Sequence, residues 1–201
     1  DLPEWQRNMA IVQWKSEGMI EPPVMEQLTA LTYRMIGSEE LWVARVYSIV
    51  FWVLGGLALY LLAKELGGSL AGLVTLGYYL TIPYAGIASR SFQPDPLMTA
   101  LICGAWWAFA RWLKAQNMRW ATAAGLLAGL SILIKSVAVF FIAFPFAAAL
   151  LFGNGWKKTI RSRQSWWIVT LCLLPYALYF FYAFVLNPYL RSEFTFRFFP
   201  H

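Results

Sequence analysis

The fold is decided by the stretch from Leu41 to Leu62, which reads LWVARVYSIVFWVLGGLALYLL. Apolar residues fill this stretch almost completely, and Arg45 is its only charged side chain. A run of about 20 apolar residues is long enough to cross the hydrocarbon core of a bilayer as a helix. The stretch therefore predicts a membrane-spanning helix.

The composition of the whole chain points the same way. Of the 201 residues, 60% are hydrophobic and 18% aromatic, and only 13% are charged. Soluble domains carry about 25% charged residues, so the composition excludes a soluble globule, a disordered tail and a disulfide-stapled secreted domain. Because the chain begins at Asp1 without an initiator Met and ends just after a new polar segment opens, we expect it to be part of a longer protein.

Five further apolar runs follow the first one. The fourth and fifth runs are short and meet at Lys135-Ser136, so they form either two short spans or one broken hairpin. The last run contains Pro175, which a membrane helix tolerates where its neighbours satisfy the freed carbonyl. We predict an all-α polytopic membrane protein with a bundle of about six spans over residues 41–187. The runs are Leu41 to Leu62, Leu70 to Ile87, Leu97 to Trp112, Trp120 to Ile134, Val137 to Phe152 and Trp166 to Leu186.

The two sets of loops contain eight basic residues each, but nine of the ten acids lie in one set, so the other set is far more basic on balance. The positive-inside rule assigns the more basic set, which contains the single acid Glu65, to the cytoplasm. We then expect residues 1–40, the 89–96 loop, the turn at Lys135 and residues 188–201, the start of a further outer segment, on the non-cytoplasmic side. The net charge of +6 is thus a topology signal and not a nucleic-acid-binding surface. The cytoplasmic basic residues are Lys64, Arg111, Lys114, Arg119, Lys157, Lys158, Arg161 and Arg163.

Residues 1–40 are predicted to form an outer loop with two amphipathic helices. Apolar residues from Trp5 to Val12 recur at helical spacing, and Gly18 is a suitable end for this first helix. A second helix is expected to begin after Pro23 and to end at Gly37. Such helices either lie flat in the membrane interface or cap the bundle, and the pattern fits both.

Charged residues near helix ends on the outer side need a reason to be there. Asp95 precedes Pro96 and suits a helix N-cap, or it is a carboxylate that faces a metal, a sugar hydroxyl or a cation such as Arg90. Lys135 is either a snorkelling lysine or a cation aimed at a phosphate. Arg90 and Lys135 together favour an anionic lipid headgroup at the outer border.

The remaining titratable residues predict less. Arg45 is expected to pair with Glu39 or Glu40. Cys103 and Cys172 lie inside apolar runs and are expected to be core residues, and with a single histidine in the chain a structural zinc site is excluded. The acids of the N-terminal segment lack the spacing of a metal site and are expected mostly on the solvated surface. They are Asp1, Glu4, Glu17, Glu21 and Glu26.

Three blocks of the sequence resemble a known enzyme family. From Glu17 to Ser48, through Glu21-Pro22-Pro23 and Ala44-Arg45, the chain resembles the first outer loop and second span of GT-C glycosyltransferases of the protein O-mannosyltransferase and aminoarabinose-transferase type, family 39. Residues 90–97 resemble the family's R-x-x-x-PD-x-L segment, and residues 125–136 resemble its G-x-x-x-G-L-x-x-L-x-K-G segment. Three blocks in the same order make the resemblance specific.

The resemblance implies a GT-C-like helical bundle that transfers a sugar from a polyprenyl-phosphate carrier to an acceptor hydroxyl on the non-cytoplasmic side. The family activates the acceptor with an acidic pair, sometimes with a divalent cation, and no other cofactor is implied. By position Glu4 matches that pair, Asp1 is a neighbouring candidate, and Asp95 matches the second acidic position. Lys135 matches the family's lysine and, with Arg90, is expected to bind the donor phosphate.

Departures from the family pattern leave a second function open. Pro3 stands where the family has the Asp of its Asp-Glu pair, and Ser136 stands where it often has Gly. A truncated or repurposed accessory subunit of a larger membrane complex, without catalysis, would also explain the aromatic content, because Trp and Phe faces can pack against partner subunits. A transporter is disfavoured because the spans contain few polar residues.

Overall fold

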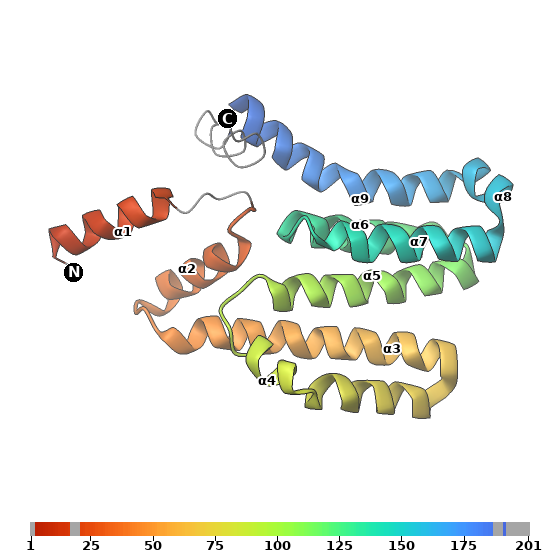
Figure 1. Cartoon of the computed structure of the whole chain (residues 1–201), viewed down its shortest axis with the longest axis horizontal. Coiled ribbons are helices and arrows are strands. Elements are labelled where there is room, and N and C mark those ends of the chain that lie inside the picture. Colours follow the sequence, from red (N-terminus) through yellow and green to blue (C-terminus); the bar gives the residue numbers. More distant parts are fainter. Residues whose placement is uncertain (1–2, 17–20, 187–190, 192–201) are drawn as a thin grey trace.

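The computed structural model describes residues 3–16, 21–186 and 191, and this described part is built from helices joined by short loops (Figure 1). The last long helix continues into a π-helical turn at Tyr182–Leu186. The helices are α1 (Glu4–Ser16), α2 (Val24–Ile36), α3 (Leu41–Thr81), α4 (Pro83–Ala88), α5 (Asp95–Ala115), α6 (Met118–Ile134), α7 (Ala138–Asn154), α8 (Trp156–Arg161) and α9 (Arg163–Phe181).

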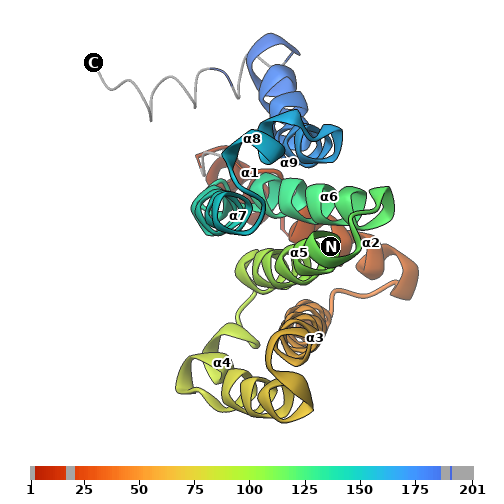
Figure 2. The ribbon, with the colours of Figure 1, turned by 90° about the vertical axis from the view of Figure 1, so that its right-hand side faces the viewer.

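The long helices lie side by side along the long axis of the molecule (Figures 1 and 2). Helix α5 packs between α3 and α6, and α9 packs against α6. Alanines fill the contact between α5 and α6: Ala105, Ala108, Ala121, Ala124 and Ala128 are all completely buried. Because their side chains are small, the two backbones can approach closely, as helices in membranes commonly do.

Helix α3 consists of two antiparallel halves that meet at Gly68. The φ angle of 85° at Gly68 lies in the left-handed region that glycine adopts without steric cost, and the chain reverses there, at the right-hand end of Figure 1. The second half packs back on the first, with the Tyr79 ring stacked on Trp52 at 4.6 Å between ring centroids. Gly55 and Gly56 leave the room that Tyr79 occupies.

The second predicted run, Leu70 to Ile87, does not form one helix. The helix ends at Thr81, Ile82 is extended with ψ at 142°, and the short α4 begins at Pro83. Proline disfavours helical geometry in the residue before it, which explains the break.

At Lys135-Ser136 the chain turns between the end of α6 and the start of α7, so this region forms two short helices.

The outside of the bundle is apolar, as expected of a membrane protein. Two helical segments, Leu41–Thr81 and Arg163–Leu186, are long and apolar enough to cross a membrane, and α6 and α7 are shorter apolar helices. The core helix of a soluble protein would be mostly buried, whereas only 22% and 17% of the most apolar windows of the two long segments are buried. With the helical architecture, this confirms the prediction of an all-α membrane protein.

Glycines bring α6 and α9 into backbone contact. A Cβ atom on Gly125 would lie 3.1 Å from the carbonyl oxygen of Ile168, and one on Gly129 would collide with the carbonyl oxygen of Leu171. Glycines four residues apart commonly serve close helix packing in membranes, and Gly125 and Gly129 do so here. The pair therefore fixes the distance between the last long helix and the centre of the bundle.

The second amphipathic helix of the N-terminal region forms where the sequence predicts it. Helix α2 begins directly after Pro23 and ends at Gly37, whose φ of 79° places it in the left-handed region and whose N–H donates to the carbonyl of Tyr33. Helix α2 packs against α3, while α1 stands apart from the bundle (Figure 1). The predicted stop of the first helix at Gly18 lies outside the described residues.

Candidate functional site

An ion pair joins two helix ends at the left-hand side of Figure 1. The Lys135 Nζ donates a hydrogen bond of 2.9 Å to Oδ1 of Asp95, and both side chains are partly buried. Lys135 follows the last residue of α6, and Asp95 is the first residue of α5. The alternative in which Asp95 is an N-cap is wrong: Pro94 occupies the cap position without a side-chain hydrogen bond, so the Asp95 carboxylate is free to bind Lys135.

Glu21 joins this pair from the segment that leads into α2. It is partly buried, it lies within electrostatic range of both Lys135 and Asp95, and its carboxyl group forms a hydrogen bond with the backbone of Ser136. Burial raises the pKa of Glu21, and the Asp95 charge acts in the same direction, while Lys135 and Ser136 oppose the shift. The hydrogen bond that Lys135 donates to Asp95 in turn holds the pKa of Lys135 above its usual value.

The Glu21–Asp95–Lys135 cluster can perform proton transfer beside a positive charge. Lys135 neutralises one of the two carboxylates and keeps two further N–H donors. Glu21 combines partial burial with a raised pKa, which are properties of a carboxylate suited to act as a general base. Lys135 already binds the Asp95 carboxylate, and the described residues contain no group of three His, Cys, Asp or Glu side chains that could hold a metal ion.

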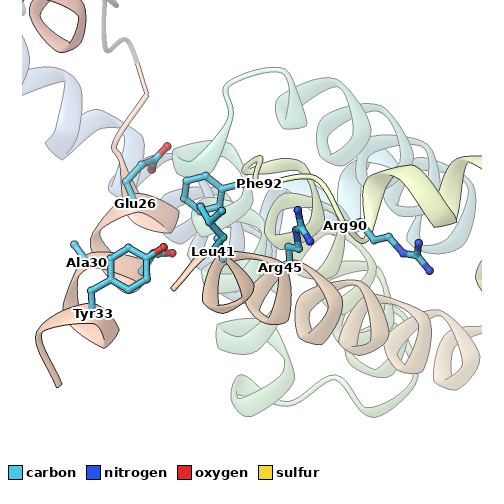
Figure 3. A pocket seen from close by; sticks show the side chains of 9 residues that line it. Glu26, Ala30, Tyr33, Leu41, Arg45, Arg90 and Phe92 are labelled. Carbon is cyan, nitrogen blue, oxygen red and sulfur yellow. The ribbon is translucent and has the colours of Figure 1, made fainter. Parts of the chain in front are cut away.

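A pocket of about 540 Å³ opens at the same end of the molecule (Figure 3). Helix α2 contributes Glu26 and Tyr33 to its wall, α3 contributes Arg45, and the loop before α5 contributes Arg90 and Phe92. Two guanidinium groups, one carboxylate and two aromatic rings around one pocket make a surface that can bind an anionic, partly apolar molecule. Its other lining residues are Thr29, Ala30, Leu41 and Ala44.

Hydrogen bonds hold the walls of this pocket in place. The Ser48 hydroxyl on α3 donates to the carbonyl of Ser91 at 2.8 Å and so fixes the loop that carries Arg90. The Thr32 and Tyr47 hydroxyls lie 2.7 Å apart and join α2 to α3. Both contacts are between elements that supply pocket residues. The pocket is therefore built into the fold.

Two predicted ion pairs are absent from the described part of the chain. Arg45 was expected to pair with Glu39 or Glu40, and Arg90 was considered a partner of Asp95, but neither arginine lies within ion-pair distance of a described carboxylate. Glu39 and Glu40 are exposed in the connection that leads into α3. Asp95 instead forms an ion pair with Lys135. Both arginines of the pocket thus keep their charge available.

The N-terminal candidates do not join the cluster. Glu4 begins α1, is exposed, and is carried on a helix that stands apart from the bundle (Figure 1). Asp1 lies outside the described residues. Among the sequence-based candidates, the structure therefore brings Asp95 and Lys135 into contact, places Arg90 in a pocket at the same end, and leaves Glu4 elsewhere.

Sequence reasoning missed Glu21, which was placed with the solvated acids of the N-terminal segment. One signal was available: Glu21 directly precedes Pro22-Pro23, and these prolines restrict the backbone just before α2. A carboxylate on such a rigid segment at a helix start keeps a more fixed position than one on an open loop, and a fixed position suits a site residue. Its partner Lys135 is more than 100 residues away in the sequence, so the contact itself could not be read from the pattern.

Comparison with known proteins assigns the chain to a family. No curated protein and no solved structure matches it significantly. The family model described as dolichyl-phosphate-mannose-protein mannosyltransferase matches residues 20–180. This match includes Glu21, both arginines of the pocket and the Asp95–Lys135 pair, and it omits Glu4. The chain therefore belongs to the dolichyl-phosphate-mannose-protein mannosyltransferase family, a family of membrane glycosyltransferases of the GT-C type.

Proposed function

We propose that this protein transfers a sugar from a polyprenyl-phosphate donor to an acceptor hydroxyl on the non-cytoplasmic side of a membrane. Family membership supports sugar transfer in a membrane. The observation that carries the proposal further is the meeting of Glu21, Asp95 and Lys135 at one end of the bundle, beside a pocket with two arginines that pair with no described carboxylate. That end contains α2 and the loop before α5, which the positive-inside rule places outside the cell interior.

In the proposed reaction Glu21 is the general base. The acceptor oxygen forms a bond to the anomeric carbon of the sugar, its proton passes to the Glu21 carboxylate, and the bond between the anomeric carbon and the phosphate oxygen breaks. The electron pair leaves with the polyprenyl phosphate. A carboxylate whose pKa is raised by burial holds the accepted proton more strongly than an exposed one, which favours this step.

Cations stabilise the charge that develops on the leaving phosphate. Arg45 and Arg90 line the pocket without a carboxylate partner among the described residues, so they can bind phosphate oxygens in the forked geometry that guanidinium favours. Lys135 already binds Asp95 and has two further donors for a phosphate oxygen. Asp95 positions Lys135, and its own negative charge helps keep Glu21 basic.

The test separates donor binding from transfer. The full chain is reconstituted in nanodiscs with radiolabelled polyprenyl-phosphate mannose, and binding is measured for the parent, Arg90→Ala, Lys135→Ala and Glu21→Gln. We expect Arg90→Ala and Lys135→Ala to weaken donor binding, and Glu21→Gln to bind the donor normally while losing transfer. Lys158→Ala and Glu40→Gln carry the same charge changes away from the site and should match the parent. Unchanged binding in both Arg90→Ala and Lys135→Ala would overturn the phosphate assignment.

The accessory-subunit alternative rests on one observation. Pro3 replaces an acid of the family's catalytic pair, and Glu4, the remaining member, is exposed on a helix that stands apart from the bundle. A noncatalytic subunit would copurify with stoichiometric partners and would show no sugar transfer even with donor bound. Sugar transfer that is lost in Glu21→Gln would show that the protein is an enzyme and not a noncatalytic subunit.

A further inference from the structure

The end of the bundle opposite the Glu21–Asp95–Lys135 cluster is strongly basic. The reversal of α3 at Gly68, the connection from α5 to α6, and α8 all lie at this end, on the right of Figure 1. Glu65 is the only acid there against eight basic residues. Eight cations around one carboxylate leave a strong positive potential that must be balanced by anions in the surroundings. The eight are Lys64, Arg111, Lys114, Arg119, Lys157, Lys158, Arg161 and Arg163.

Between α3 and α5, this basic end contains a pocket of about 500 Å³. Its walls are Leu61, Lys64 and Glu65 from α3 and Trp107 and Arg111 from α5. Two of the five side chains are cationic and one is a large aromatic ring. Polar and apolar groups thus meet in one pocket, a combination that is common where a membrane helix passes from hydrocarbon to headgroups.

The single carboxylate of this pocket, that of Glu65, already forms two ion pairs. Glu65 lies 3.2 Å from Arg111 and 3.2 Å from Lys114, and Lys114 also donates to the backbone carbonyl of Glu65 at 2.9 Å. These bonds tie the end of the first half of α3 to the end of α5. One negative charge shared by two cations leaves a net positive charge before Lys64 is counted.

Lys64 and Arg111 keep unfilled capacity for an anion. Lys64 lies over the Tyr60 ring, 5.8 Å from its centroid, and pairs with no carboxylate among the described residues. The guanidinium of Arg111 is held over the Trp120 ring at 5.2 Å, and its Nε is buried without a hydrogen-bond partner. A buried guanidinium N–H left unpaired is costly, so an anion that accepts from it would be favoured.

We infer that this pocket binds the phosphate headgroup of an anionic phospholipid in the membrane leaflet next to the basic end. The phosphate would lie between Lys64 and Arg111 beside the Trp107 ring. Leu66 and Leu70, which are 71% and 76% exposed on the two sides of the α3 reversal, lie nearby in the chain and offer an apolar surface for the acyl chains. Basic pockets between membrane helices on the more positive side suit this ligand chemistry. This site is separate from the proposed transfer site and independent of it.

The test uses the full chain in detergent micelles doped with either phosphatidylglycerol or phosphatidylcholine, with bound lipid counted by native mass spectrometry. We expect phosphatidylglycerol to be retained in preference to phosphatidylcholine, and Lys64→Gln to weaken its binding about fivefold, as loss of one cation near a charged headgroup predicts. Lys64 forms no ion pair with any residue that the structure describes, so this variant should fold. Lys158→Gln removes the same charge from α8 at the same end and serves as the matched control.

Three results would overturn the inference. Equal losses in Lys64→Gln and Lys158→Gln would mean that the lipid is attracted by diffuse charge and has no site. Equal retention of phosphatidylglycerol and phosphatidylcholine would remove the requirement for an anionic headgroup. Displacement of the lipid by inorganic phosphate at matched concentration would make a free phosphate ion, and not a lipid, the ligand of the pocket.

Discussion

Lys135 Nζ lies 2.9 Å from Asp95 Oδ1, and this contact joins the end of α6 to the beginning of α5. The two residues are 40 positions apart in the sequence. Each sits at the end of a helix whose neighbours are almost entirely apolar, so the pair neutralises two charges that would otherwise be costly at the membrane border. It also sets the position of the ammonium group that faces Glu21.

The Lys135–Asp95 ion pair should make the free energy of unfolding fall at alkaline pH. The pKa of Lys135 is raised above 10.5 by its hydrogen bond to Asp95, so its stabilising contribution is present below 10.5 and is lost as the pH rises through the folded-state value. We expect Asp95→Asn to unfold at a lower temperature than the parent at neutral pH, with a difference of about 1 kcal/mol in unfolding free energy. The difference should shrink at pH values well above 10.5. Thermal unfolding by tryptophan fluorescence measures both, and a difference that stays constant with pH would contradict the assignment.

If Glu21 is the general base, the pH profile of transfer should have an acid limb, in which the rate falls as Glu21 becomes protonated. Glu21 must be deprotonated to accept a proton, and its pKa is raised above 4.5 by burial. As the pH falls, transfer should therefore decline at a higher pH than an ordinary glutamate would give. The pH profile of kcat/KM measures this limb. Glu21→Gln should lower transfer by at least about 100-fold and abolish the limb, whereas Glu40→Gln should keep the parent profile.

The contact between α6 and α9 predicts an effect on stability without an effect on charge. A methyl group at Gly129 would collide with the backbone of α9, so Gly129→Ala should destabilise the protein by about 2 kcal/mol. Gly77 lies in α3 with open space where its Cβ would be, and Gly77→Ala should be neutral or stabilise the helix by about 0.5 kcal/mol. Thermal unfolding of the two variants compares the same substitution in two environments. Equal effects would mean that helix propensity, and not packing, governs both positions.

The orientation in the membrane can be measured by cysteine labelling. Ser38 is exposed in the turn after α2, and Lys158 is exposed on α8 at the opposite end. With a membrane-impermeant maleimide, Ser38→Cys should be labelled in intact cells and Lys158→Cys only after permeabilisation. The native Cys103 is buried and Cys172 partly so, which keeps background labelling low. The reverse pattern would invert the topology and place the proposed transfer site in the cytoplasm.

Local sequence signals predicted much of the fold, because the features concerned depend on neighbouring residues. Pro23 and Gly37 bound α2 through their own backbone preferences, and the spacing of Gly125 and Gly129 is typical of a close helix contact. The break between the runs Leu41 to Leu62 and Leu70 to Ile87 was also predicted from the sequence, and the structure places the reversal at Gly68 inside it.

The candidate site was predicted only in part, because its key contacts join distant segments. Asp95 and Lys135 were both identified as candidates, but their pairing depends on how α5 and α6 pack. The same is true of Glu21: the prolines that follow it indicate a rigid segment, but nothing in the neighbouring sequence shows that it lies near Lys135. Long-range contacts of this kind follow from the tertiary arrangement and leave no periodicity in the sequence.

The reversal at Gly68 also constrains how the protein enters the bilayer during synthesis. At about 1.5 Å per residue, the half of α3 from Gly68 to Thr81 is only about 20 Å long, shorter than a hydrocarbon core of about 30 Å. A nascent chain could not release this half into lipid on its own. The two halves would therefore leave the translocon together as a preformed hairpin, with Gly68 at its tip.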